Sequence, residues 1–151
     1  MKHILLVEDD PYKETGLRRA MLEIVGDMEL RLATSVQTAV AAVRSIVFDL
    51  VILDMALPSH DRSLGKGNPR QMPSGGLEVL LNLNEKRRVD PVIIVTQYPE
   101  IEVNGQLIPI NQVPDVLLGF VDVSLRGIVL YDEFAPEWRE QFQTIVRGCF
   151  D

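Results

Sequence analysis

The stretch HILLVEDDP, residues 3–11, starts with a short apolar run and ends in three acidic residues and a proline. Such an apolar run is typical of a strand in a parallel sheet that helices cover on both faces. Asp10 suits the N-cap of a helix, and Pro11 suits the first helical position. The stretch therefore predicts a buried strand that leads directly into a helix, with Glu8 and Asp9 at the junction.

The same alternation of strand and helix continues along the chain. Short β-branched runs predict strands over residues 3–7, 29–33, 49–54, 91–96 and 127–131. Apolar residues at helical spacing predict helices over residues 11–24, 36–43, 76–86, 113–125 and 138–149. The predicted fold class is therefore α/β, a doubly wound five-stranded parallel sheet in the common strand order 2-1-3-4-5 with helices on both faces.

Two segments do not fit this alternation. Residues 59–74 are polar, contain glycines and prolines and have no periodicity, so they are expected to form an inserted loop. Residues 101–108 carry Asn104-Gly105 between apolar residues, which predicts an inserted hairpin that lies outside the five-stranded core. The whole chain, residues 1–151, is predicted to be a single domain that carries these two insertions.

Composition excludes several classes of partner. The chain has 15 basic and 22 acidic side chains, a formal charge of −7, and no basic stripe, so no direct binding to nucleic acid is expected. The apolar run near the N-terminus is too short for a signal peptide or a membrane span. We therefore expect a cytoplasmic protein with no membrane partner.

Acidic and hydroxyl side chains follow the predicted strands at the point where each strand ends. Glu8 and Asp9 follow the first strand, Asp54 ends the third, and Thr96 ends the fourth. Ligands of open parallel sheets bind beyond these carboxyl ends, where the strand order reverses, so the four side chains are expected to converge. Crowded carboxylates repel one another unless a cation such as Mg²⁺ binds between them. The carboxylate of Asp54 is then the candidate nucleophile towards a phosphoryl group.

Three stretches, ILLVEDDP at 4–11, VILDMALP at 51–58 and VIIVT at 92–96, resemble the CheY-like receiver domains of bacterial response regulators in two-component systems. The resemblance implies a flavodoxin-like sheet and a bound Mg²⁺. It also implies that Asp54 accepts the phosphoryl group and that the hydroxyl of Thr96 contacts that group. The implied metal ligands are Asp9 directly, Glu8 in support, Asp54, and the backbone carbonyl of Ala56.

The sequence departs from the receiver pattern on the side of the fifth strand. Receivers place a lysine at the end of this strand, where Tyr131 stands here. Ile128 stands where many receivers have an aromatic residue, and Gln97 replaces a small residue after Thr96. A cation from the 59–74 loop is one alternative source of positive charge over Asp54; the candidates are Arg62, Lys66 and Arg70.

Two functions of different classes follow. In the first, the chain is a stand-alone receiver, not an enzyme, to which a histidine kinase or phosphotransfer protein donates a phosphoryl group. In the second, it is a pseudo-receiver that binds a protein constitutively and has no phosphorylation switch; Tyr131 and Ile128 favour this alternative. A metal-dependent phosphohydrolase ranks last, because no further acid or base is visible.

The expected output of either function is protein binding. The last predicted helix ends at the C-terminus, so no output domain is expected to follow it. The resemblance implies an interaction face on the fourth helix, fifth strand and fifth helix, and the predicted hairpin lies at its entrance. We therefore expect a downstream protein target or self-association through residues 101–138.

Overall fold

The computed structural model describes residues 1–62 and 67–150. Its central sheet has five parallel strands in the order β2-β1-β3-β6-β9, which confirms the predicted doubly wound fold. The strands are β1 (Lys2–Val7), β2 (Met28–Ala33), β3 (Leu50–Leu53), β6 (Val92–Thr96) and β9 (Leu125–Leu130). The order reverses between β1 and β3, so their carboxyl ends mark the expected ligand edge.

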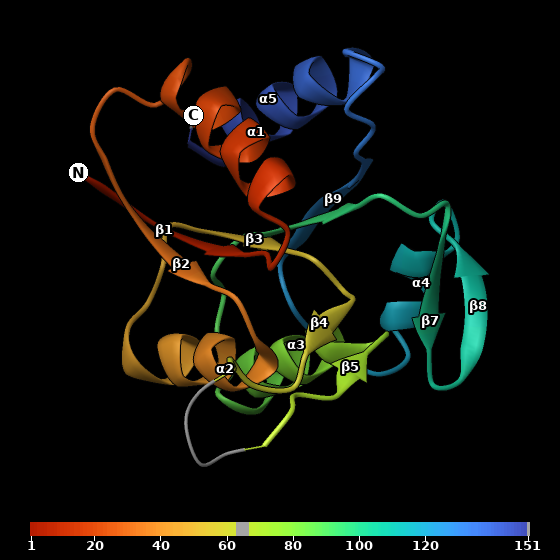
Figure 1. The fold of residues 1–151 in the computed structure, drawn as a ribbon. Coiled ribbons are helices and arrows are strands. Elements are labelled where there is room, and N and C mark those ends of the chain that lie inside the picture. The colour runs from red at the N-terminus through yellow and green to blue at the C-terminus, as the bar shows by residue number, and fades with distance from the viewer. Residues whose placement is uncertain (63–66, 151) are drawn as a thin grey trace.

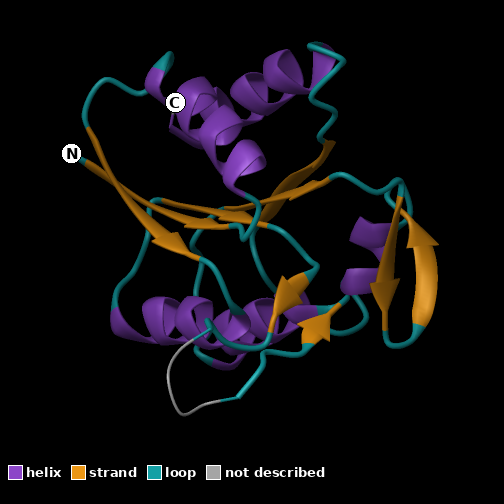
Figure 2. Cartoon of the chain, viewed as in Figure 1, coloured by secondary structure: helices purple, strands orange, loops and turns teal. Residues whose placement is uncertain are grey.

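Helices cover both faces of the sheet (Figures 1 and 2). One face carries α1 (Pro11–Leu22) and α5 (Glu137–Phe150), and the other carries α2 (Val36–Ser45) and α3 (Gly75–Glu85). Side chains of β1 alternate between the two layers: Ile4 belongs to the core under α1 and α5, and Leu5 to the core under α2 and α3. Burial on both faces explains why the central strands are continuously apolar.

Local sequence explains where α1 and α2 begin. The Asp10 side chain accepts a hydrogen bond from Tyr12 N at 2.9 Å, and Pro11 occupies the first turn of α1, as predicted. Ser35 caps α2, and its side chain forms a reciprocal capping box with Thr38. Three residues separate β1 from α1, and two separate β2 from α2. The loops at the ligand edge are therefore short.

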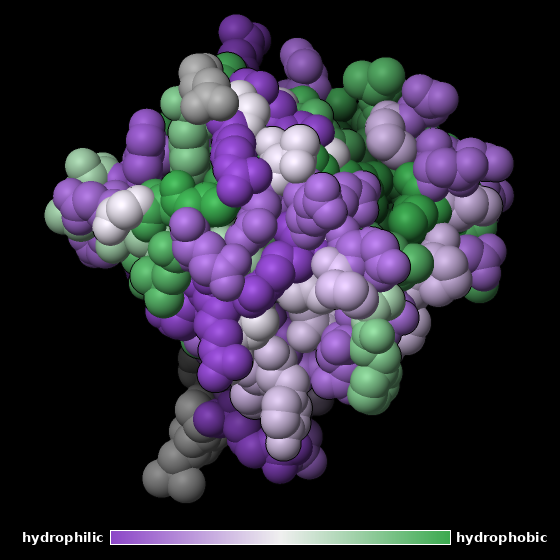
Figure 3. Space-filling model, turned by 90° about the horizontal axis from the view of Figure 1, so that it is seen from above, coloured by the Kyte–Doolittle hydropathy of each residue, from purple (hydrophilic) through white to green (hydrophobic). Residues whose placement is uncertain are grey.

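The α1 and α5 layer presents a largely hydrophilic outer surface with separate hydrophobic patches (Figure 3). Trp138 and Phe142 of α5 are buried against the sheet, so their helical spacing marks a core face, as predicted. Among residues 1–62 and 67–150, no helix combines the length and the apolar character needed to cross a membrane.

Two small antiparallel ladders lie outside the main sheet. β4 (Leu57–Pro58) pairs with β5 (Gln71–Met72) and joins the two ends of the predicted 59–74 loop. β7 (Glu100–Val103) pairs with β8 (Gln106–Pro109) and forms the hairpin that Asn104-Gly105 predicts, with both turn residues at positive φ.

The hairpin lies outside the five-stranded sheet, as predicted, but two of its side chains belong to the hydrophobic core, which was not expected. Ile101 and Val103 of β7 are 3% and 2% exposed and belong to the same apolar cluster as α2 and α3. The hairpin lies beside α4 (Val113–Leu117), and Val113 and Leu117 belong to this cluster too (Figure 1). The hairpin and α4 therefore close one end of the core together.

The predicted helix over residues 113–125 is also wrong in its length. α4 ends at Leu117, and Leu125 already belongs to β9, which starts two residues before the predicted 127. Gly119 and the β-branched Val121 and Val123 favour extended chain over helix. In addition, the backbone N–H of Asp122 donates to the side-chain oxygen of Asn84 at 2.8 Å, outside any helical pattern.

Candidate functional site

The structure brings the three predicted carboxylates together at the ligand edge. Glu8 and Asp9 follow β1, Asp54 follows β3, and the last residues of these strands, Val7 and Leu53, are neighbours in register. One oxygen from each carboxylate lies within 4.8 Å of the others. The side chains of Glu8 and Asp54 are 2% and 12% exposed, whereas Asp9 is exposed. The cluster therefore has a buried floor and an open side.

Burial makes the charge of this cluster costly. Burial, and then the carboxylate of Asp54, raise the pKa of Glu8 to about 7, although Lys13 lowers it. Burial also raises the pKa of Asp54 and of Asp9 above their ordinary values. Oxygen ligands that repel one another in a partly open pocket suit a hard divalent cation. The donor set of Glu8, Asp9 and Asp54 thus fits Mg²⁺.

Close packing fixes the chain after Asp54. Gly76, in the first turn of α3, donates its backbone N–H to Met55 O at 2.8 Å. A Cβ at Gly76 would lie 2.6 Å from Asp54 O and 2.8 Å from Met55 Cα, so only glycine permits this approach. The packing holds the backbone that leads to Ala56, whose carbonyl remains a predicted metal ligand. Pro58, the last residue of the stretch VILDMALP, lies in β4.

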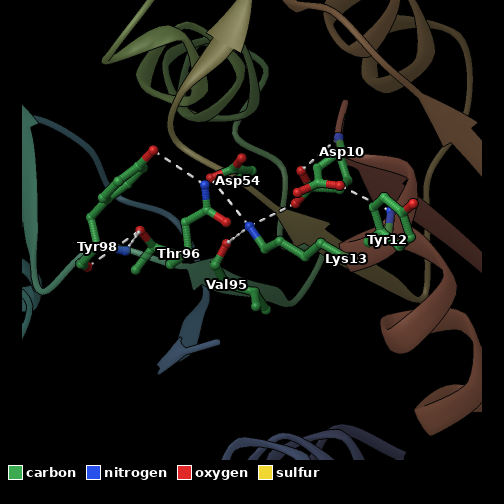
Figure 4. Close-up of polar contacts among 9 residues, drawn as sticks. Asp10, Tyr12, Lys13, Asp54, Val95, Thr96 and Tyr98 are labelled. Carbon is green, nitrogen blue, oxygen red and sulfur yellow. Dashed lines mark hydrogen bonds and ion pairs between the residues drawn. The ribbon is translucent and has the colours of Figure 1, made fainter. Parts of the chain in front are cut away.

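Thr96 lies at the expected strand end, but its hydroxyl bonds to the next loop. The side chain is buried at the end of β6, the strand beside β3. Its hydroxyl accepts a hydrogen bond from Tyr98 N at 3.1 Å and lies 3.4 Å from Tyr98 O (Figure 4). Contact between Thr96 and a phosphoryl group therefore remains a prediction that requires the hydroxyl to change partners.

Lys13 is a residue of the site that the sequence analysis missed. Its side chain is 1% exposed, and its ammonium lies between three acceptors (Figure 4). The distances from Nζ are 2.7 Å to Glu8 Oε1, 2.8 Å to Val95 O and 3.5 Å to Asp54 Oδ1. The signal was its position on α1, because Lys13 shares the buried face of Leu17 and Ala20.

The cations of the 59–74 loop do not take this place in the described part of the chain. Arg62 and Arg70 are exposed, and neither forms an ion pair with Asp54 within residues 1–62 and 67–150. Lys66, the third candidate, lies outside the described residues. The described cation at Asp54 comes from α1.

Tyr131 fills the space next to α1 at the end of β9. Its ring packs on Trp138 with 4.7 Å between centroids. A Cβ at Gly16 would lie 3.0 Å from the Tyr131 hydroxyl, so the glycine admits the ring against the helix. Burial, and then the nearby Glu133, raise the pKa of Tyr131 above its ordinary value. Tyr131 is therefore a neutral group where receivers place a lysine.

The other two departures lie on β9 and directly after β6. Ile128 is partly buried against the apolar cluster of α2 and α3. Gln97 is exposed and donates through Nε2 to the Tyr98 hydroxyl at 3.2 Å. Both residues belong to the β6 and β9 side of the site, which differs most from the receiver pattern.

A five-stranded doubly wound sheet with this acidic edge defines a response-regulator receiver, and solved receivers share the fold. Response regulator TrrA of Thermotoga maritima, solved in complex with Mg(2+)-BeF, is 23% identical with a TM-score of 0.61, over 96% of this chain and 99% of that one. The non-phosphorylated HemR receiver domain of Leptospira biflexa is 18% identical with a TM-score of 0.62, over 99% of this chain and 94% of that one.

Curated relatives define the family more narrowly. The Detocs response regulatory protein DtcB of Vibrio alginolyticus is 39% identical over 111 residues, which cover 72% of this chain and 74% of the relative. The protein of the same name from Enterobacter cloacae (strain JD6301) is 28% identical over 138 residues, 90% of this chain and 92% of the relative. No protein-family model matches the sequence. The chain belongs to the family of Detocs response regulatory proteins.

Proposed function

We propose that this chain is a cytoplasmic phospho-acceptor whose Asp54 receives a phosphoryl group from a histidine kinase or phosphotransfer protein. The observation that carries the proposal is the cluster of Glu8, Asp9 and Asp54, with carboxylate oxygens within 4.8 Å of one another at the ligand edge. Relatives named as response regulatory proteins support it. Mg²⁺ would be held by Asp9, Asp54 and the carbonyl of Ala56.

The only chemistry proposed for the chain is its own phosphorylation and dephosphorylation. It is not proposed to act as an enzyme on a separate substrate. An oxygen of Asp54 attacks phosphorus as the P–N bond to the donor's imidazole breaks. The imidazole leaves with the electron pair and takes a proton from water. When bound, Mg²⁺ supplies positive charge to the phosphoryl oxygens. Glu8 Oε2 accepts from Asp10 N at 3.1 Å and so orders the loop that carries Asp9.

The test is incubation of the purified chain with acetyl phosphate and Mg²⁺, followed by intact mass. We expect a gain of one phosphoryl group that chelation of Mg²⁺ prevents. Beryllofluoride with Mg²⁺ should shift NMR signals near residues 9 and 54. A chain that gains no phosphoryl group and shows no shift would contradict the proposal.

A pseudo-receiver is the second candidate, and the neutral Tyr131 at the usual lysine position favours it. Ile128 favours it too, because it replaces the aromatic residue of many receivers. In that case the protein binds its partner constitutively, and neither acetyl phosphate nor beryllofluoride changes the binding. The experiment above separates the two candidates.

The proposed output surface is the face within residues 101–138, and its partner is a downstream protein or a second copy. Five large apolar side chains in this range are exposed: Leu107 at 66%, Leu118 at 76%, Phe120 at 46%, Leu130 at 39% and Phe134 at 89%. Exposed large apolar side chains are candidates for contact with a protein partner. The Thr96–Tyr98 hydrogen bond connects the acidic edge with this face, because β7 starts two residues after Tyr98.

A further inference from the structure

The buried ammonium of Lys13 needs an explanation beyond the packing of α1. Taking an ammonium out of water costs several kcal/mol unless charges and hydrogen bonds compensate for it. Lys13 is 1% exposed, on a helix face that otherwise carries Leu17, Ala20 and Met21. An apolar residue here would pack without that cost. The ammonium is therefore retained for what it contacts.

The contacts with Glu8 and Val95 hold the ammonium of Lys13 in place, and the longer contact with Asp54 leaves an N–H available for another acceptor. Nζ lies 2.7 Å from Glu8 Oε1 and donates to Val95 O at 2.8 Å, which fixes it between the ends of β1 and β6. The distance to Asp54 Oδ1 is 3.5 Å, an ion pair at the limit of a hydrogen bond. An ammonium has three donors, so one N–H remains for an acceptor on the Asp54 side.

The end of β9, which supplies a lysine in receivers, supplies no cation here. Tyr131 stands there, its ring on Trp138 and its hydroxyl against Gly16. Gly16 lies on α1, the same helix as Lys13, so the tyrosine and the lysine occupy adjoining places between α1 and the ligand edge. Both line one open pocket of about 410 Å³ at this edge.

We propose that Lys13 contacts the phosphoryl group on Asp54 and takes over, from α1, the charge neutralisation that receivers obtain from the end of the fifth strand. The proposal rests on the proposed function. When the O–P bond to Asp54 forms and the donor's P–N bond breaks, anionic phosphoryl oxygens arrive beside Nζ, and its free N–H donates to one of them.

The test compares Lys13→Met with Lys86→Met, which makes the same change at an exposed lysine at the end of α3. The rate of phosphorylation by acetyl phosphate is measured by intact mass at saturating Mg²⁺, and Mg²⁺ affinity is measured separately by NMR titration. We expect Lys13→Met to lower the rate about 100-fold, the usual effect of losing one donor to a developing anion. Mg²⁺ affinity should not fall, because the variant removes a positive charge from the carboxylates, and the rate of Lys86→Met should stay near the wild-type value.

Rescue separates contact with the phosphoryl group from a merely structural role. The double variant Lys13→Met/Tyr131→Lys should be phosphorylated about tenfold or more faster than Lys13→Met, because it returns a cation to the same edge. If Lys13→Met does not fold, Lys13→Met/Glu8→Gln removes both buried charges and is compared with Glu8→Gln alone. The double variant, which lacks Lys13, should then be phosphorylated about 100-fold more slowly than Glu8→Gln.

The outcomes distinguish this proposal from the proposed function. A wild type that accepts phosphate while Lys13→Met matches its rate overturns the role of Lys13 alone. A loss of Mg²⁺ affinity as large as the loss of rate, with no rescue by Tyr131→Lys, also overturns it. A wild type that accepts no phosphoryl group overturns both proposals.

Discussion

The two halves of the ligand edge differ in how closely they follow the receiver pattern. At the ends of β1 and β3, Glu8, Asp9 and Asp54 lie together as the sequence predicts. At the ends of β6 and β9, Thr96 bonds to its own loop and Tyr131 replaces a lysine. The predicted hairpin and an α4 that is shorter than predicted follow β6.

This difference separates two requirements of the site. The carboxylates proposed to hold Mg²⁺ and to accept a phosphoryl group follow two neighbouring strands, β1 and β3, and this half keeps the receiver pattern. The cation and the hydroxyl depend on what surrounds them. Lys13 shows that a cation can reach Asp54 from α1, within 3.5 Å, when the end of β9 provides none. The positions of the carboxylates thus follow from strand order. In the other half, the cation can come from a different element of the fold.

The largest expected effect comes from removing the nucleophile. Asp54→Asn should abolish phosphorylation, because an amide oxygen is a far weaker nucleophile than a carboxylate. Intact mass after incubation with acetyl phosphate and Mg²⁺ measures it. Asp49→Asn is the matched control, since Asp49 lies just before the other end of β3 and is exposed. Phosphorylated Asp54→Asn would place the acceptor elsewhere.

A smaller loss should follow removal of a metal ligand. Asp9→Asn should weaken Mg²⁺ binding about tenfold or more, because a carboxylate with a raised pKa in a crowded cluster gains most from the cation. NMR titration with Mg²⁺ measures the affinity. Asp10→Asn is the control, because Asn keeps the N-cap of α1. Equal affinities for the two variants would exclude Asp9 as a ligand.

The pH dependence of stability tests the buried carboxylate cluster without a phosphoryl donor. The pKa of Glu8 rises from 4.5 to about 7 in the fold, so the folded state binds more protons than the unfolded state between these values. The free energy of unfolding of the metal-free protein should therefore fall as pH rises from about 4.5 to about 7. Urea denaturation in EDTA measures it.

Two comparisons sharpen this pH test. Glu8→Gln should flatten the decline, since the amide does not titrate, and Mg²⁺ should oppose it near neutral pH. A stability that rises over the same pH range in the metal-free wild type would show that ion pairing with Lys13 outweighs the burial of Glu8.

The smallest expected effect concerns the proposed output surface. Leu107→Ser removes an exposed apolar side chain on β8, so it should weaken self-association or partner binding without unfolding the chain. Analytical ultracentrifugation or cross-linking measures the association. Val47→Ser, an exposed apolar residue between α2 and β3, is the control. Cross-links that map to α1 instead would move the interface to the other layer.

The acidic half of the site could be predicted because strand order alone determines it. Apolar runs locate β1 and β3, and their parallel pairing places Glu8 and Asp54 at one edge. The hairpin could be predicted from Asn104-Gly105. In each case a local pattern specifies the backbone, and the side chains follow from it.

The other half depends on contacts between distant segments. Lys13 donates to Val95, 82 residues away, and a charged residue on an apolar helix face does not by itself identify its partner. Ile101 and Val103 are buried in the same apolar cluster as Val113 and Leu117 of α4, whose length periodicity overestimated. The partner of the Thr96 hydroxyl depends on the turn at Tyr98, which no local pattern specified.

The central claim is that the two halves act as one phosphoryl-binding site, and NMR of the wild type with Mg²⁺ and beryllofluoride tests it most directly. We expect the amide signals of Asp9 and Ala56 to shift together with those of Thr96 and Tyr98, and the Lys13 ammonium signal to change with them. Shifts confined to Asp9 and Ala56, with Thr96, Tyr98 and Lys13 unchanged, would contradict the account.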